Sequence, residues 1–243
     1  MLLAILLLVG AVLGAGLLVR AVPESRSRLW LKPLLAFSGA YLFTLTITHL
    51  LPEAIALRVG APQQIGYWTL GGFFAQVLLE LLSQGIEHGH VHTSPAEAGR
   101  VPLGLLLALV LHALLEGSIL VGSGHEGAEH SFFAVALGVA LHHVPAAVAL
   151  ATLLRVQLGS MARAWPWLSV FALASPAGLL FSNYVMLPQL LGGAYASLLG
   201  FVAGTFLHVS TTILFETSPE HRLNWTKLGA TVGGVLLALG VSG

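Results

Sequence analysis

Long apolar runs separated by short polar stretches dominate the chain. Each run holds about 20 residues, the length that an α-helix needs to cross the hydrocarbon core of a bilayer. Proline, glycine and charged residues separate one run from the next. The pattern predicts eight membrane-spanning helices, at about residues 2–19, 33–57, 65–86, 101–121, 131–154, 165–187, 194–215 and 223–242. We expect the first run to be a span rather than a signal peptide, because no basic segment precedes it and it is long for one.

The composition supports this interpretation. Of the 243 residues, 56% are hydrophobic and only 8% are charged, whereas a soluble domain carries about 25% charged residues. The chain is therefore predicted to be an all-α integral membrane protein with a single domain over 1–243, lying in the cell membrane with lipid as a partner. The net charge of zero argues against a nucleic-acid partner. Because the chain has no cysteine, any metal site must use nitrogen and oxygen ligands.

The basic residues predict an orientation for the eight spans. Of the ten lysines and arginines, only Arg58 falls on one side of the predicted arrangement. The others fall on the opposite side: Arg20, Arg26, Arg28, Lys32, Arg100, Arg155, Arg163, Arg222 and Lys227. Since cytoplasmic loops carry an excess of Lys and Arg, this side is predicted to be cytoplasmic and both termini to lie outside the cytoplasm.

Four ionisable residues fall near the middle of two consecutive predicted spans. His112 and Glu116 are four residues apart, so they share one helix face, and His142 and His143 lie at the same depth on the next span. Ionisable groups inside a membrane are costly and usually mark a site or pathway. Imidazole and carboxylate ligands suit Zn²⁺ and similar divalent ions, and three histidines with one glutamate could complete a tetrahedral shell. The alternative is that the histidines only hydrogen-bond between helices. Adjacent helical residues also point about 100° apart, so His143 need not face the same ion as His142.

Further polar residues lie toward the two membrane surfaces. His49 and Glu53, four residues apart near the outer end of 33–57, could receive an ion from outside. The inner half of 65–86 and the loop after it could release an ion through Gln76, Glu80, Gln84, His88, His90 and His92. Alternating histidines in a loop are typical of weak metal binding, although a solvated turn would explain them equally well. We expect His208 to be a packing residue.

Small residues recur at the spacing of helix contacts. Gly200 and Gly204 share one span, and Gly229 and Gly233 share another. Such faces let helix backbones approach closely. They could be used inside the chain or in a homodimer.

Several segments together carry a resemblance to a known family. They are HLLPEA (49–54), GGFFAQVLLELLSQGIEHGHVH (71–92), HALLEG (112–117), HHVPAA (142–147), ASPAG (174–178) and AGTFLHVSTTILFETSPE (203–220). In this combination the sequence resembles the ZIP (Zrt/Irt-like) family of divalent-metal transporters. The resemblance runs from the second predicted span to the eighth. It implies an eight-span bundle that moves Zn²⁺, or a similar ion such as Fe²⁺, Mn²⁺ or Cd²⁺, toward the cytoplasm by alternating access.

The resemblance also implies roles for individual residues. His112, Glu116 and His142 match ligand positions of the family, and His143 stands where the family usually has a carboxylate. Three departures concern the second metal position that some members use: Ala113, Ala146 and Ser175 stand where a ligand would be expected. We therefore expect one metal ion per site rather than two.

Other functions are compatible with the same residues. The leading prediction is a transporter and not an enzyme. A multispan zinc-dependent membrane hydrolase would use similar ligands, with the metal activating a water. A metal-binding ZIP homologue with impaired transport and a haem-bearing electron-transfer subunit are further alternatives.

Overall fold

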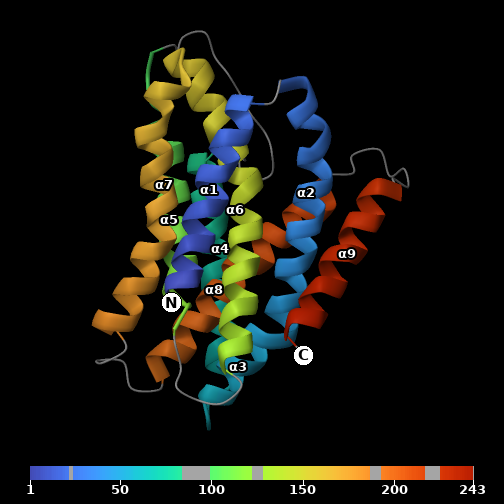
Figure 1. Ribbon diagram of the computed structural model, residues 1–243. Helices are drawn as coiled ribbons and strands as arrows, with labels where there is room; N and C mark the ends of the chain where they lie inside the picture. Colours follow the sequence, from blue (N-terminus) through green and yellow to red (C-terminus); the bar gives the residue numbers. More distant parts are fainter. Residues whose placement is uncertain (22–23, 84–98, 122–127, 187–192, 217–224, 243) are drawn as a thin grey trace.

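The computed structural model describes residues 1–21, 24–83, 99–121, 128–186, 193–216 and 225–242, and every element within these ranges is helical. The elements are α1 (Leu2–Ala21), α2 (Glu24–Leu45), η1 (Thr46–Leu50), α3 (Leu51–Leu57), α4 (Gln63–Ser83), α5 (Leu103–Ser118), α6 (Ala128–Leu158), α7 (Met161–Phe181), η4 (Ser182–Met186), α8 (Gly193–Glu216) and α9 (Trp225–Ser242). Figure 1 shows them as an elongated bundle. Two short π-helical turns, η1 and η4, continue α2 into α3 and extend the end of α7.

Six helices are long and apolar enough to cross a membrane: Leu2–Ala21, Trp30–Leu57, Gln63–Leu82, Phe132–Leu158, Met161–Val185 and Gly193–Phe215. Two shorter apolar helices, Leu103–Ser118 and Trp225–Val241, complete the set among the described residues. The prediction of an all-helical, multi-pass membrane protein is therefore confirmed, while the count of eight spans stays a prediction. Several helices extend beyond the predicted spans, and the largest extension is that of α2, which begins at Glu24. An apolar run marks the part of a helix that lies in lipid and not where the helix ends.

The helices pack in pairs. The most extensive contacts join α4 to α8, α2 to α9, α1 to α6 and α5 to α7. By contrast, α5 and α6, which follow one another in sequence, pack against each other only slightly. His143 of α6 nevertheless contacts Glu116 of α5, so the predicted site lies between two helices that pack mainly against other partners.

The apolar interior is divided into two clusters. One includes Ala134–Ala140 of α6 with residues of α1, α2, α8 and α9. The other includes the buried alanines and leucines between Ala146 and Leu158 of α6 with residues of α1, α5 and α7. His142 and His143 fall on α6 between these two stretches and are buried. The histidines therefore lie in a polar layer that interrupts an otherwise continuous apolar core.

Glycines allow several of these helix pairs to approach closely. A Cβ atom added at Gly204 would lie 1.9 Å from the backbone oxygen of Thr69 on α4. One added at Gly234 would lie 2.2 Å from the backbone oxygen of Phe37 on α2. The prediction that Gly204 packs against another helix is confirmed, whereas a Cβ atom added at Gly229 would have nothing within 4 Å, so Gly229 makes no close contact with the described residues of this chain. Spacing along the chain predicts the period of the small residues but not which of them faces a neighbour.

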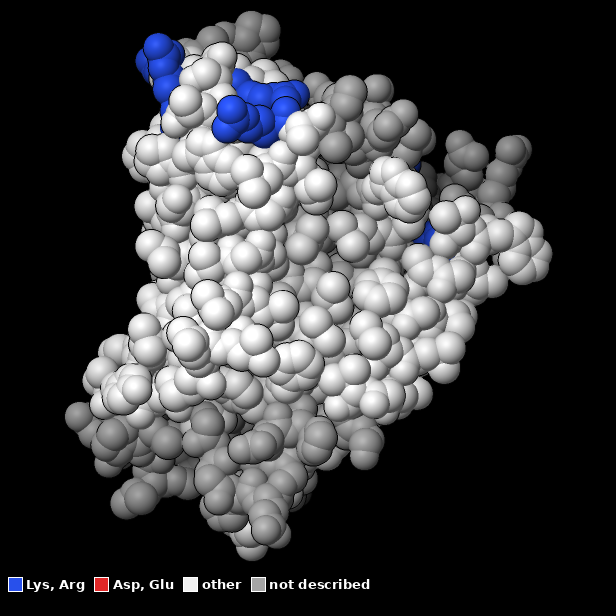
Figure 2. All heavy atoms as spheres, viewed as in Figure 1, with Lys and Arg blue, Asp and Glu red and all other residues white. Residues whose placement is uncertain are grey.

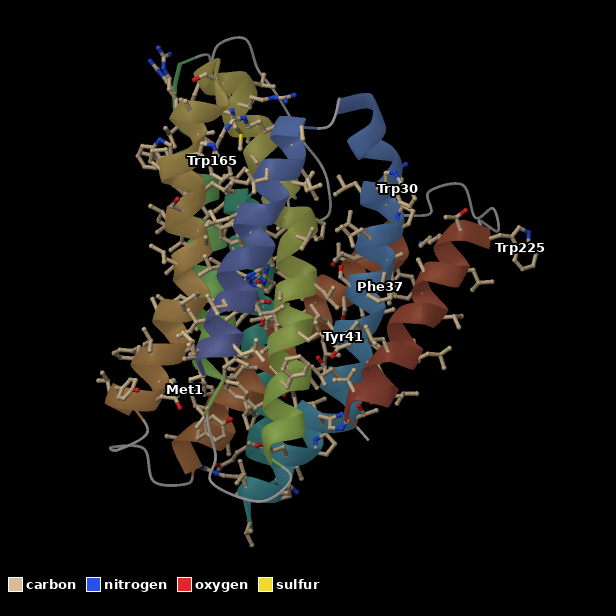
Figure 3. The ribbon with its side chains drawn as sticks, viewed as in Figure 1. Met1, Trp30, Phe37, Tyr41, Trp165 and Trp225 are labelled. Carbon is tan, nitrogen blue, oxygen red and sulfur yellow. The ribbon has the colours of Figure 1, made fainter. Side chains whose placement is uncertain are left out.

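Polar and aromatic groups distinguish the two ends of the bundle. Figure 2 shows that most of the Lys and Arg side chains visible on this face gather at its upper end, where Figure 1 has the end of α1 and the connection from α6 to α7. Figure 3 shows Trp30, Trp165 and Trp225 in the upper half of the same view. Tryptophan is enriched at membrane interfaces. Both chain termini lie lower in the view, away from the basic end (Figure 1).

Candidate metal centre

Two residues of the candidate centre come from one face of α5. His112 and Glu116 lie four residues apart, and the Nε2 atom of His112 is 3.1 Å from the Oε1 atom of Glu116. Both side chains are almost completely buried, at 3% and 0% exposure. A run of leucine, alanine and valine surrounds them on α5. The helix therefore holds a carboxylate and an imidazole together within an apolar bundle.

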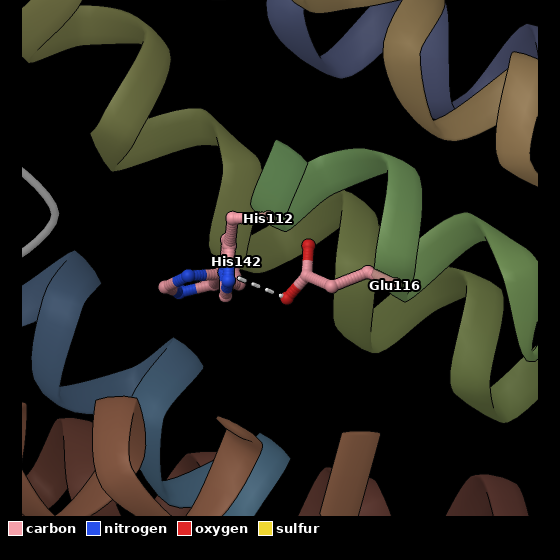
Figure 4. Close-up of side chains that lie close together, drawn as sticks. All are labelled: His112, Glu116 and His142. Atoms are coloured by element: carbon pink, nitrogen blue, oxygen red, sulfur yellow. Dashed lines mark ion pairs between the residues drawn. The ribbon is translucent and has the colours of Figure 1, made fainter. Parts of the chain in front are cut away.

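His142 of α6 completes a group that could hold a metal ion. One potential ligand atom each from His112, Glu116 and His142 lies within 4.8 Å of the others, and this is the one such group among the described residues. The rings of His112 and His142 are 5.8 Å apart and nearly perpendicular. Figure 4 shows both imidazoles beside the Glu116 carboxylate. Tetrahedral Zn²⁺ with bonds of about 2.0–2.1 Å separates its ligand atoms by about 3.3 Å, which is close to the observed distance between His112 and Glu116.

His143 contacts the other side of the same carboxylate. Its Nε2 atom lies 2.6 Å from the Oε2 atom of Glu116, while His112 lies at Oε1. His143 also packs against the ring of Phe171 on α7. The structure thus brings all four predicted residues together, although His143 is not part of the three-residue group. The adjacent histidines diverge, as the 100° step of an α-helix requires.

The close contact between α5 and α7 fixes the position of α5, and therefore of Glu116, relative to α7. Gly117 approaches α7 so closely that an added Cβ would lie 2.0 Å from the backbone oxygen of Ser175. Gly178 of α7 in turn approaches the backbone oxygen of Leu114. The hydroxyl of Ser175 donates to the backbone oxygen of Ala113 at 2.7 Å. Ser175 therefore uses its hydroxyl between the helices, at a position where a further ligand would be expected in a two-metal site.

Two polar side chains of α4 contact histidines on neighbouring helices. The Oε1 atom of Gln76 lies 2.9 Å from the Nδ1 atom of His112. One turn further along α4, the Oε2 atom of Glu80 lies 2.5 Å from the Nε2 atom of His208 on α8. The ring of His208 also packs edge-on against Phe73, as expected for a packing residue. Its pairing with Glu80 was missed because nothing in a single sequence shows which helix faces which.

The remaining predicted residues lie elsewhere. His49 lies in the π-helical turn η1, with its Nδ1 atom 2.6 Å from the hydroxyl of Thr48, and Glu53 lies on α3. Both are partly exposed, and neither joins the three-residue group. Four of the residues predicted for ion release lie outside the described residues: Gln84, His88, His90 and His92.

Comparison with known proteins bears on this centre. No protein-family model matches the chain. The chain is, however, 29% identical over 177 residues to the zinc transporter ZIP9 of Xenopus tropicalis. This similarity supports membership of the ZIP family. The match covers 70% of the chain but 58% of the relative, so the chain spans little more than half of the length of the curated ZIP protein that it matches.

Proposed function

We propose that this chain transports a divalent metal cation, with Zn²⁺ as its principal substrate, across the cell membrane toward the cytoplasm. The observation that carries the proposal is the buried group of His112, Glu116 and His142, which lies between two apolar clusters of a membrane bundle. Buried ionisable residues in a membrane are costly and mark ion pathways. The similarity to a zinc transporter supports zinc. Fe²⁺, Mn²⁺ and Cd²⁺ are further candidate substrates.

In this proposal one ion is bound at a time, by His112, Glu116 and His142. His143 supports the Glu116 carboxylate through its second oxygen instead of binding the ion. A second ion would need ligands that Ala113 and Ala146 do not supply, and both of these alanines are buried. One carboxylate neutralises only half of the charge of a divalent ion. A site of this kind can therefore bind the ion without holding it too tightly for release.

Transport requires the buried site to open alternately to each side of the membrane. The basic residues at one end of the bundle support a cytoplasmic position for that end, and the placement of both termini away from it supports an outer location for them. His49 and Glu53 would receive the ion from outside, and Glu80 would lie on its way out. A hydrolase is less well supported, because a centre between two apolar clusters is remote from the lipid headgroups that such an enzyme attacks.

The test is zinc uptake into proteoliposomes that contain an internal fluorescent zinc indicator. We expect His142→Ala and Glu116→Gln each to reduce the initial rate at least about tenfold, because each removes a ligand. Leu111→Ala is the matched control, since Leu111 precedes His112 on α5 but its side chain is 41% exposed on the outside of the bundle. This variant should transport as the wild type does. Equal uptake by wild type and His142→Ala would refute the assigned site, and no uptake by any protein would refute transport.

A further inference from the structure

Gln76 of α4 contacts the metal group through His112. Its side chain is completely buried, and its Oε1 atom lies 2.9 Å from the Nδ1 atom of His112. α4 packs chiefly against α8, whereas α5, which carries His112, packs chiefly against α7. The hydrogen bond therefore joins two helices with different main partners. A buried glutamine in a membrane helix is costly unless its polar atoms are used.

The direction of this hydrogen bond decides the chemistry of His112. An amide oxygen only accepts hydrogen bonds, so the Nδ1 atom of His112 must donate. A neutral imidazole that carries its hydrogen on Nδ1 has a lone pair on Nε2. That lone pair faces the Oε1 atom of Glu116 at 3.1 Å. Two acceptor atoms at this distance repel each other, and a divalent cation bound to both removes the repulsion.

We propose that Gln76 is a positioning residue that orients His112 as a metal ligand by fixing its Nδ1–H tautomer. Residues that bind the second nitrogen of a ligating histidine orient the ring and raise its basicity. This inference rests on the proposed function and deepens it, since it assigns Gln76 to the binding site itself rather than to the release path predicted from the sequence. It also makes the affinity of the site depend on the position of α4 relative to α5.

The proposal is tested by metal titration of the purified full-length protein in detergent, with Zn²⁺ competition and the visible absorption of bound Co²⁺. Gln76→Met keeps the length of the side chain but removes the acceptor. Its Kd for Zn²⁺ should rise about 10–100-fold, and the Co²⁺ spectrum should change. Gln76→Glu restores an acceptor and should recover the wild-type affinity and spectrum, a rescue that a purely structural role would not produce.

Gln157→Met is the matched control. Gln157 is also a buried glutamine, at 6% exposure, but it lies 15 residues beyond His142 on α6, about 22 Å along the helix. Its replacement should leave zinc affinity unchanged, and a comparison of thermal midpoints separates effects on binding from loss of folding. The proposal is overturned if Gln76→Met binds Zn²⁺ as the wild type and Gln157→Met do, or if Gln76→Glu binds as weakly as Gln76→Met. If His112→Ala abolishes binding in that case, the proposed function stands. A wild-type protein that binds no metal would overturn both.

Discussion

The contact between Gly117 and α7 makes the geometry of the metal group sensitive to a single methyl group. A Cβ atom at this position would lie 2.0 Å from the backbone oxygen of Ser175, and real Cβ contacts are essentially never shorter than 3.0 Å. The Gly117→Ala substitution must therefore separate α5 from α7 by about 1 Å. Because the obstructing atoms belong to the backbone, no side-chain rotation can relieve the contact. Glu116, the adjacent residue, must move with α5.

The expected effects follow from that displacement. Overpacking of this kind costs about 1–3 kcal/mol, and the gain in helix propensity from glycine to alanine returns about 0.5–1 kcal/mol. The net loss is therefore at most about 2.5 kcal/mol, which would lower the thermal midpoint by up to about 10 °C for a chain of this length. A shift of about 1 Å at Glu116 also disturbs its contacts with His112 and His143, so we expect zinc affinity to fall at least about tenfold.

Both quantities can be measured on detergent-solubilised protein, by tryptophan fluorescence on heating and by zinc titration. Gly10→Ala is the matched control, because an alanine Cβ at Gly10 on α1 would have nothing within 4 Å. That variant should keep the wild-type affinity and should be as stable as the wild type or slightly more so. The reasoning is refuted if Gly117→Ala and Gly10→Ala have the same midpoint and the same affinity.

Three further predictions concern other features. Tyr41 donates from its hydroxyl to the backbone oxygen of Ala134 at 2.9 Å, so Tyr41→Phe should reduce the free energy of unfolding by about 0.5–1.5 kcal/mol; denaturation that shows no loss would mean that the bond contributes nothing. Because the chain has no cysteine, a single introduced cysteine reports its own side of the membrane without background labelling. Val59→Cys should react with an impermeant maleimide added outside intact cells, and Ala162→Cys should react only after permeabilisation. The reverse result would invert the proposed orientation. Zinc affinity should fall as the pH is lowered from about 7.5 to 5.5, because protons compete with the metal for imidazole nitrogens; titrations with equal affinity at both values would argue against histidine ligands.

The sequence by itself determined the class of the protein and the composition of its centre. A run of about 20 apolar residues that crosses lipid must form a helix, because an α-helix satisfies its backbone hydrogen bonds within the segment itself. The four-residue spacing of His112 and Glu116 placed them on one face, since that spacing is a local property of the helix. His142 and His143 fall at the same predicted depth in the membrane on the next span, which indicated them as partners of His112 and Glu116. These inferences use only distances along the chain and the thickness of a membrane.

The tertiary structure decided which atoms meet. Helix spacing could not show that His143 contacts the second oxygen of Glu116 while His142 joins the metal group. Nor could it show that Gln76 belongs with His112, or that Glu80 pairs with His208, because these contacts join residues on different helices. Every span is apolar along most of its length, so the pattern along it identifies no partner. The choice of neighbour depends on the shapes of the packed surfaces, such as the glycine contacts that bring α5 against α7, and those shapes exist only once the bundle is assembled.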